Sequence, residues 1–146
     1  MDTAEVQATH HLSSFNLDFL LGVREVTVDG VAAEFRKPNR HELLITPRRT
    51  IDRGDRFTVV VRYAVTPSRL GYLGESNWLA NDLEGLTMNQ PLTAPWWYPA
   101  NDHPLDPARH DFYITVPRGK DVVANGLLPA QAAEIRGTRT GWPRPT

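Results

Sequence analysis

Histidine is the residue type in this chain with the widest chemical use, because imidazole binds metals and transfers protons near neutral pH. One of the five histidines begins the segment His41-Glu42-Leu43-Leu44-Ile45, which shares its first two residues with the zinc-binding pattern HExxH. That pattern needs a second histidine four residues later on the same helix face, and Ile45 stands there instead. His10 and His11 are adjacent on a predicted strand and point to opposite faces. Neither place is therefore predicted to bind a metal.

A carboxylate–imidazole cluster is conceivable farther along the chain. His103 and His110 flank three aspartates, Asp102, Asp106 and Asp111. Prolines fix the turn around the first of these residues, and aspartate in a turn commonly accepts hydrogen bonds from backbone N–H groups. The sequence therefore favours a structural role for Asp102 over a metal site.

No complete set of catalytic groups is recognisable. A serine nucleophile needs a histidine base and a strained turn that presents it, and none of the serines lies in such a context: Ser13, Ser14, Ser68 and Ser76. Spacing singles out no carboxylate pair for glycoside cleavage. The chain alone is predicted to carry no catalytic residue.

Four aromatic residues offer a binding alternative: Trp78, Trp96, Trp97 and Tyr98. They would suit a stacking platform for sugar rings or bases, or they would fill the core of a sheet covered by a loop. No basic groove accompanies them, so the core interpretation is favoured. The platform stays open as a second hypothesis.

The elements that position these residues are predicted to be strands. Alternation of apolar and polar residues with a period of two marks half-buried strands at residues 6–12, 15–19, 41–46, 57–63, 112–116 and 122–128. No segment shows sustained helical periodicity with caps. We therefore predict an all-β antiparallel sheet or sandwich.

The clearest hairpin lies at Asp29-Gly30. This pair suits the two positive-φ positions of a type I′ turn. A two-residue turn pairs Val28 with Val31 and Val26 with Ala33, and this register agrees with the apolar pattern. By contrast, residues 86–117 read as one long aromatic and proline-rich loop, and loops of this length are usually functional.

Composition sets limits on size, partners and compartment. The chain has 146 residues, is 40% hydrophobic and contains 16 basic against 17 acidic residues, which suits one domain and gives no basic patch for nucleic acid or an anionic membrane. It has no cysteine for disulfides or thiolate metal sites. Acidic residues at Asp2 and Glu5 are unlike a secretory signal, so a cytoplasmic location is expected.

The stretch from Thr87 to Pro104 resembles a loop in the N-terminal domain of zinc aminopeptidases of the aminopeptidase N family, typically TQFEPTAARRAFPCFDEP. The two align without a gap and match at Thr87, Pro91, Ala94, Pro99, Asp102 and Pro104, and conservatively at Gln90 and Tyr98. Five further segments resemble successive strands of that domain in the same order: residues 15–19, 26–30, 43–47, 57–63 and 122–126. The resemblance covers roughly residues 4–128.

The resemblance implies a saddle-like all-β N-terminal domain over residues 1–128, with its first strand missing, and a poorly ordered tail over residues 129–146. Members of the family release N-terminal amino acids from peptides with a zinc ion held by HExxH and a later glutamate, and a GAMEN loop helps to bind the substrate amine. Neither motif occurs here. The chain is thus expected to be a fragment at both ends. It would need no cofactor itself and would partner a catalytic domain that holds the zinc.

By the same resemblance, Gln90 is the candidate substrate-binding residue, because it stands where the family has the Glu or Gln that binds the free α-ammonium of the peptide. An amide oxygen accepts from an ammonium group, but less strongly than a carboxylate. The alternative is an amide that only caps the loop.

Departures from the family pattern at Met88, Asn89 and Pro95-Trp96 alter the outer contacts of the loop. The predicted function is that of a non-catalytic domain framing a peptide cleft; the alternative is a stand-alone β-sandwich binding or adhesion module.

Overall fold

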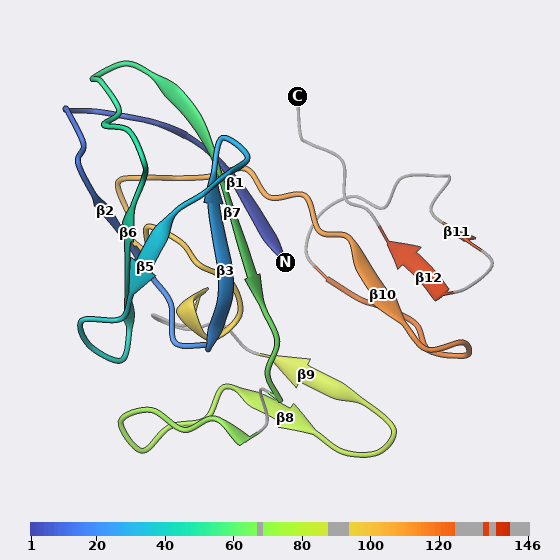
Figure 1. The fold of residues 1–146 in the computed structure, drawn as a ribbon. Helices are drawn as coiled ribbons and strands as arrows, with labels where there is room; N and C mark the ends of the chain where they lie inside the picture. The colour runs from blue at the N-terminus through green and yellow to red at the C-terminus, as the bar shows by residue number, and fades with distance from the viewer. Residues whose placement is uncertain (67–68, 88–93, 125–132, 135–136, 141–146) are drawn as a thin grey trace. The chain divides into compact units, whose positions relative to one another are not determined.

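The structure is a computed structural model of the whole chain, and it describes residues 1–66, 69–87, 94–124, 133–134 and 137–140. The chain divides into two compact units, Met1–Pro104 and Leu105–Thr146. Every strand pairing is antiparallel, and the described residues contain no α-helix, so the predicted all-β class is confirmed (Figure 1). Within this part of the chain no helix is long and apolar enough to span a membrane.

The first sheet of the Met1–Pro104 unit is built around one long strand. Its order is β1 (Asp2–Gln7), β7 (Arg56–Tyr63), β3 (Val23–Val28) and β4 (Val31–Ala32). The predicted alternation of β7 is confirmed, because Phe57, Val59 and Val61 are buried while the residues between them are more exposed. Each buried side chain of β7 lies on the sheet face that forms the core.

The turn between β3 and β4 has the predicted type and register. Asp29 has a φ of 50° and Gly30 a φ of 76°, and Val28 pairs with Val31. The Asp29 carboxylate also accepts a hydrogen bond from the backbone N–H of Thr58 at 2.8 Å. The ladder is shorter than predicted, because beyond it only the Ala33 N–H still donates to the Val26 carbonyl, at 3.0 Å. The chain then leaves for a second sheet.

The second sheet has the order β2 (Phe15–Asp18), β6 (Glu42–Thr46) and β5 (Glu34–Arg36). Leu43 and Ile45 on β6 are both 0% exposed, as the alternation predicts. The residues that follow His41 therefore form an extended strand and not the helix that a zinc-binding HExxH motif requires.

One apolar core joins the two sheets. The buried side chains of both sheets form a single cluster, which also includes residues from the connections between the strands. Two aromatic pairs cross it: the ring centroids of Phe15 and Phe57 lie 5.4 Å apart, and those of Phe19 and Tyr63 lie 4.8 Å apart. The arrangement is that of a sandwich whose inner faces interdigitate.

A small hairpin follows that the sequence did not predict. β8 (Trp78–Ala80) pairs with β9 (Gly85–Thr87), and the carbonyl oxygen of the Asn81 side chain accepts from the N–H groups of Leu83 and Glu84 at 2.7 and 2.9 Å. The start of the predicted loop 86–117 is therefore strand. A short 3₁₀ turn, η2 (Ala94–Trp96), lies farther along it.

The Leu105–Thr146 unit contains a three-stranded sheet of order β10 (Ile114–Val116), β12 (Gly137–Thr140) and β11 (Ala133–Glu134). β10 lies inside the predicted strand 112–116. β11 and β12 lie inside the predicted tail 129–146, and β12 pairs with β10 on one side and with β11 on the other. The predicted strand 122–128 is not formed over residues 122–124, and its other residues lie outside the described ones.

The burial of β6 generates a prediction about stability. Leu43→Ala removes a fully buried side chain and should lower the free energy of unfolding by about 2–5 kcal/mol. Leu44→Ala, on the opposite face of the same strand, should cost markedly less, because Leu44 is only half-buried. Urea denaturation of both variants measures the difference. Equal losses would contradict the observed register.

Candidate functional site

The predicted substrate-binding residue, Gln90, lies outside the described residues, but both ends of its segment are described. On one side, β9 ends at Thr87, three residues earlier; on the other, η2 begins at Ala94, four residues later. The contacts of these two ends are the part of the candidate site that the structure describes.

The downstream end is fixed to the sandwich by backbone hydrogen bonds. The N–H of Leu20 donates to the Pro95 carbonyl at 2.9 Å. Asp18 and Ala100 exchange both of their backbone hydrogen bonds, with N···O distances of 2.7 and 3.2 Å. Because Asp18 belongs to β2, the aromatic segment runs beside an edge strand and satisfies its backbone groups.

The turn after Ala100 is held by a carboxylate from β2. The Asp18 carboxylate accepts a hydrogen bond from the Asp102 N–H at 3.0 Å. The acceptor that was predicted from the sequence was the carboxylate of Asp102, whereas here Asp102 supplies the backbone donor. Burial, and then the negative charge of Asp18, raise the pKa of the Asp102 carboxyl above its ordinary value.

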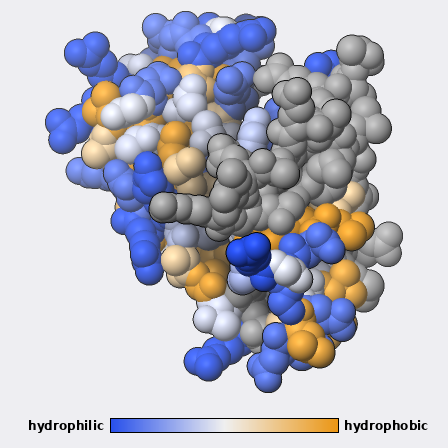
Figure 2. Space-filling view, turned by 90° about the vertical axis from the view of Figure 1, so that its right-hand side faces the viewer, coloured by the Kyte–Doolittle hydropathy of each residue, from blue (hydrophilic) through white to orange (hydrophobic). Residues whose placement is uncertain are grey.

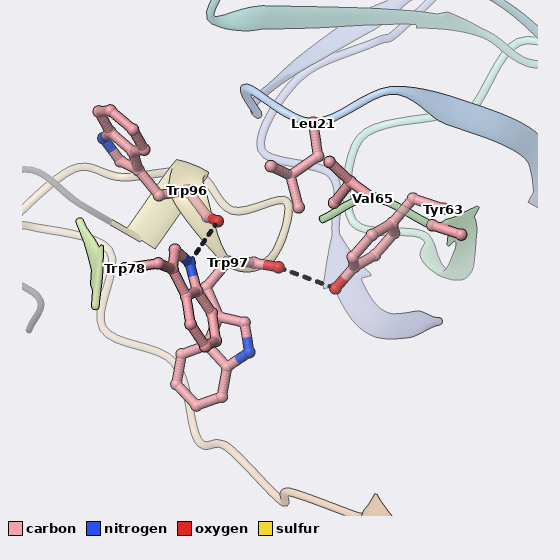
Figure 3. Close-up of a pocket in the computed structure, with 7 residues that line it drawn as sticks. Leu21, Tyr63, Val65, Trp78, Trp96 and Trp97 are labelled. Carbon is pink, nitrogen blue, oxygen red and sulfur yellow. Dashed lines mark hydrogen bonds between the residues drawn. The ribbon is translucent and has the colours of Figure 1, made fainter. Parts of the chain in front are cut away.

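Trp78 links the two ends of the segment. Its backbone pairs with Thr87 across the β8–β9 hairpin, and its indole Nε1 donates to the Trp96 carbonyl at 3.3 Å (Figure 3). The Trp78 ring also meets the Trp97 ring edge-on, with centroids 6.4 Å apart. One residue, Trp78, therefore contacts Thr87 before the Gln90 segment through its backbone and Trp96 after that segment through its side chain.

The aromatic residues are partly core and partly surface. Trp96 is 4% exposed, which confirms the core prediction for that residue, whereas Trp78, Trp97 and Tyr98 are only half-buried. Trp78, Trp96 and Trp97 border an open pocket of about 260 Å³ together with Leu21, Tyr63, Ala64 and Val65 (Figure 3). The platform hypothesis therefore keeps a physical basis.

Tyr63 connects β7 to this aromatic segment. Its hydroxyl donates to the Trp97 carbonyl at 2.9 Å. Burial, and then the charge of Asp2, raise the pKa of Tyr63 to about 12. The hydroxyl stays protonated at neutral pH and keeps its role as a donor.

The histidines occupy separate structural positions. The Nδ1 atom of His41 lies 3.1 Å from the Tyr72 hydroxyl, and that of His11 lies 2.8 Å from the Asp52 carboxylate. His10 lies beside Thr9, with Nδ1 3.1 Å from its hydroxyl. The structure therefore uses these imidazoles in short-range contacts on different parts of the sandwich.

The conceivable cluster of histidines and aspartates is divided between the two units. Asp102 and His103 belong to Met1–Pro104, while Asp106, His110 and Asp111 belong to Leu105–Thr146. Within the second unit, the His110 ring stacks on the Phe112 ring with centroids 5.8 Å apart. Across the described residues, no group of three or more histidine or acidic side chains is placed to hold a metal ion. These residues therefore do not fit a zinc site.

The fold is similar to part of several solved structures, whereas sequence comparisons found no match. No family model matches the sequence, and no curated protein matches it. Among solved structures, the chain is similar to an M1 zinc metallopeptidase from Deinococcus radiodurans, with a TM-score of 0.80 and 25% identity over 96% of this chain and 33% of that chain. The same values hold for a mutant from that organism bound to a Tyr-Ser-Ala substrate and for a two-domain M1 zinc metallopeptidase mutant bound to L-arginine.

The chain spans about a third of the length of the solved structures that it matches. The resemblance predicted from the sequence is confirmed: the chain resembles the N-terminal domain of M1 zinc aminopeptidases.

The hydrogen bond of Tyr63 generates a prediction about alkaline stability. Tyr63→Phe should lower the free energy of unfolding at pH 7 by about 0.5–1.5 kcal/mol, because the Trp97 carbonyl loses its donor. A pKa of about 12 in the folded protein exceeds the ordinary 10.0, so the wild-type chain loses stability as the pH rises from 10 through 12. The Phe variant should lose less free energy of unfolding over that interval.

Urea titrations at several pH values measure this, with Tyr113→Phe, which is 69% exposed in the wild type, as the control. Parallel pH profiles for wild type and Tyr63→Phe would contradict the assignment.

Proposed function

We propose that this chain, which resembles the N-terminal domain of M1 zinc aminopeptidases, acts as the non-catalytic domain of such an enzyme. In this role it frames one side of a peptide-binding cleft, and Gln90 binds the N-terminal amine of the substrate. The zinc ion and the groups that cleave the peptide bond belong to a partner catalytic domain. The reaction of the assembled enzyme is the release of N-terminal amino acids from peptides.

The fold match carries this proposal. A TM-score of 0.80 over 96% of the chain, with no gap in the motif alignment around Gln90, supports an equivalent place for the loop in this protein. One matched structure holds a Tyr-Ser-Ala substrate and another holds L-arginine, and both ligands carry a free amine. An amine-binding role for this fold is consistent with those ligands.

The chemistry assigned to Gln90 is recognition, not bond cleavage. A primary ammonium carries three N–H donors and no acceptor, so it requires oxygen atoms as partners. The Gln90 amide oxygen supplies one acceptor without adding a negative charge. A bond from a charged donor to a neutral acceptor is stronger than a neutral bond but weaker than an ion pair. The residue therefore selects peptides with free N-termini at moderate affinity.

A second candidate function rests on the aromatic pocket. Its volume of about 260 Å³ and its three tryptophans favour binding of a small apolar or ring-shaped ligand by a stand-alone module. Ligand pockets usually enclose about 300–1,000 Å³. This pocket is small and open by that standard, so the peptidase-domain function ranks first.

The non-catalytic assignment predicts an inactive isolated chain. The purified 146-residue protein, supplied with zinc and aminoacyl amides, should hydrolyse none of them above the buffer rate, because its sequence lacks HExxH and its described residues include no group of three or more side chains placed to hold a metal ion. Release of the free amino acid and of the amine measures this. Turnover that persists through gel filtration and co-elutes with the chain would refute the assignment.

The role of Gln90 predicts a change in substrate binding. In a protein that carries both domains, Gln90→Ala should raise the KM for free-amine peptides about 10-fold or more, because a hydrogen bond from a charged donor is worth about 1.5–3 kcal/mol. Gln90→Glu should lower the KM, since a carboxylate adds charge assistance. Steady-state kinetics on one peptide series measures both effects.

An N-acetylated peptide provides the matched control. It lacks the ammonium group, so its inhibition constant should be the same for the wild type and for Gln90→Ala. If Gln90→Ala weakens the binding of the acetylated peptide as much as that of the free peptide, Gln90 only shapes the loop. Its assignment as the amine acceptor is then wrong.

A further inference from the structure

The β8–β9 hairpin has two apolar faces, and only one of them is packed. Trp78 points to the face that meets Trp97. Leu79 and Leu86 are direct partners across the ladder, so they share the opposite face. They are 61% and 54% exposed. The hairpin therefore presents a cross-strand leucine pair to water.

The tip of the hairpin extends this exposed surface. Leu83 in the turn is 75% exposed, and the neighbouring Asp82 and Glu84 are exposed as well. The two hydrogen bonds to the Asn81 side chain fix the turn that carries them. Figure 2 shows that apolar side chains lie among hydrophilic ones on the face of the molecule that it draws. We refer to Leu79, Leu83 and Leu86 as the leucine face.

Leu79 and Leu86 are exposed apolar neighbours in a hairpin whose other side is packed. Two-stranded hairpins are marginally stable alone, and this one is already attached to the sandwich through Trp78. Leu79 and Leu86 lie on the side of the ribbon opposite Trp78. A contiguous apolar patch with a polar rim is typical of a protein contact.

We propose that the leucine face is the surface on which the zinc-bearing catalytic domain docks, an inference that rests on the proposed function. The matched chains are about three times as long as the part that this fold covers, and one is described as having two domains. In such chains this fold must contact a larger neighbour.

The position of the leucine face along the chain selects it over other surfaces. Leu86 lies four residues before Gln90, and four extended residues span at most about 14 Å. A peptide amine held at Gln90 lies between this domain and the catalytic domain. The surface that leads directly into that loop must then approach the same neighbour.

The apolar and acidic residues of the leucine face indicate which residues its partner presents. The occupant presents an apolar patch to the leucines and basic side chains to Asp82 and Glu84 at the rim. A second copy of this chain would instead bring the same acidic residues together, and like charges across an interface disfavour association. The catalytic domain is therefore the occupant that the charges favour.

Hydroxyl-radical footprinting tests the proposal on two samples: the 146-residue chain, and the protein in the length that its own cells make. Oxidation of Leu79 and Leu86 should be several-fold slower in the second sample, while Val31, on another hairpin and 49% exposed, should react equally in both. Equal leucine oxidation would overturn the proposal. So would leucines already protected in the 146-residue chain, or protection that disappears on dilution as self-association does.

Threonine variants provide an independent measurement. Leu79→Thr with Leu86→Thr should leave the unfolding temperature of the 146-residue chain unchanged, because both side chains are already exposed there. The same pair should lower it by several degrees in the protein of native length. Val31→Thr, the matched control, should lower it in neither. An equal effect of the leucine pair in both samples would overturn docking at this face.

The outcomes separate this inference from the function on which it rests. Protected leucines together with an unchanged KM for Gln90→Ala would remove the role of Gln90 and keep the docking surface. A raised KM together with unprotected leucines would keep the role of Gln90 and remove the docking surface.

Discussion

The exchange of backbone hydrogen bonds between Asp18 and Ala100 is the constraint on which the rest of the site depends. On its other edge, β2 pairs with β6, so this exchange extends the second sheet by one more strand-like segment. The Asp18 carboxylate then orients the next turn through the Asp102 N–H. Without this contact, the aromatic segment would leave an edge strand uncovered and would lose its fixed path back from η2. The aromatic segment that ends at Ala100 is thus a continuation of the second sheet.

The parts of the fold that could be predicted from the sequence are those set by local patterns. Asp29-Gly30 forms its turn because the two residues tolerate positive φ, and Leu43 and Ile45 enter the core because the strand period places them on one face. The β8–β9 hairpin has strands of three residues each, with exposed leucines, so alternation could not reveal it. The asparagine turn at Asn81, followed by Gly85, was the one available signal. β12 pairs with β10 through residues more than 20 positions away along the chain, and a local pattern does not reveal such a pairing.

The candidate site divides in the same way. The identity of Gln90 came from the motif alignment, which compares residues in order along the chain and needs no knowledge of contacts. Its frame could not be predicted, because Trp78 contacts a carbonyl 18 residues away and Asp18 contacts a backbone group 84 residues away. Contacts at such separations are decided by how the sheets pack. For the same reason the sequence named Asp102 as the acceptor of the turn when the acceptor lies on β2.

The bridge made by Trp78 has a consequence for how the loop can vary. Trp78 contacts Thr87 through its backbone and Trp96 through its indole, and both contacts lie outside residues 88–93. Under the proposed function, fixing a residue on each side of the segment that carries Gln90 would lower the entropy cost of ordering that segment around a ligand. An amide or a carboxylate at position 90 would then use the same surrounding structure and would differ in how strongly it binds a positive charge.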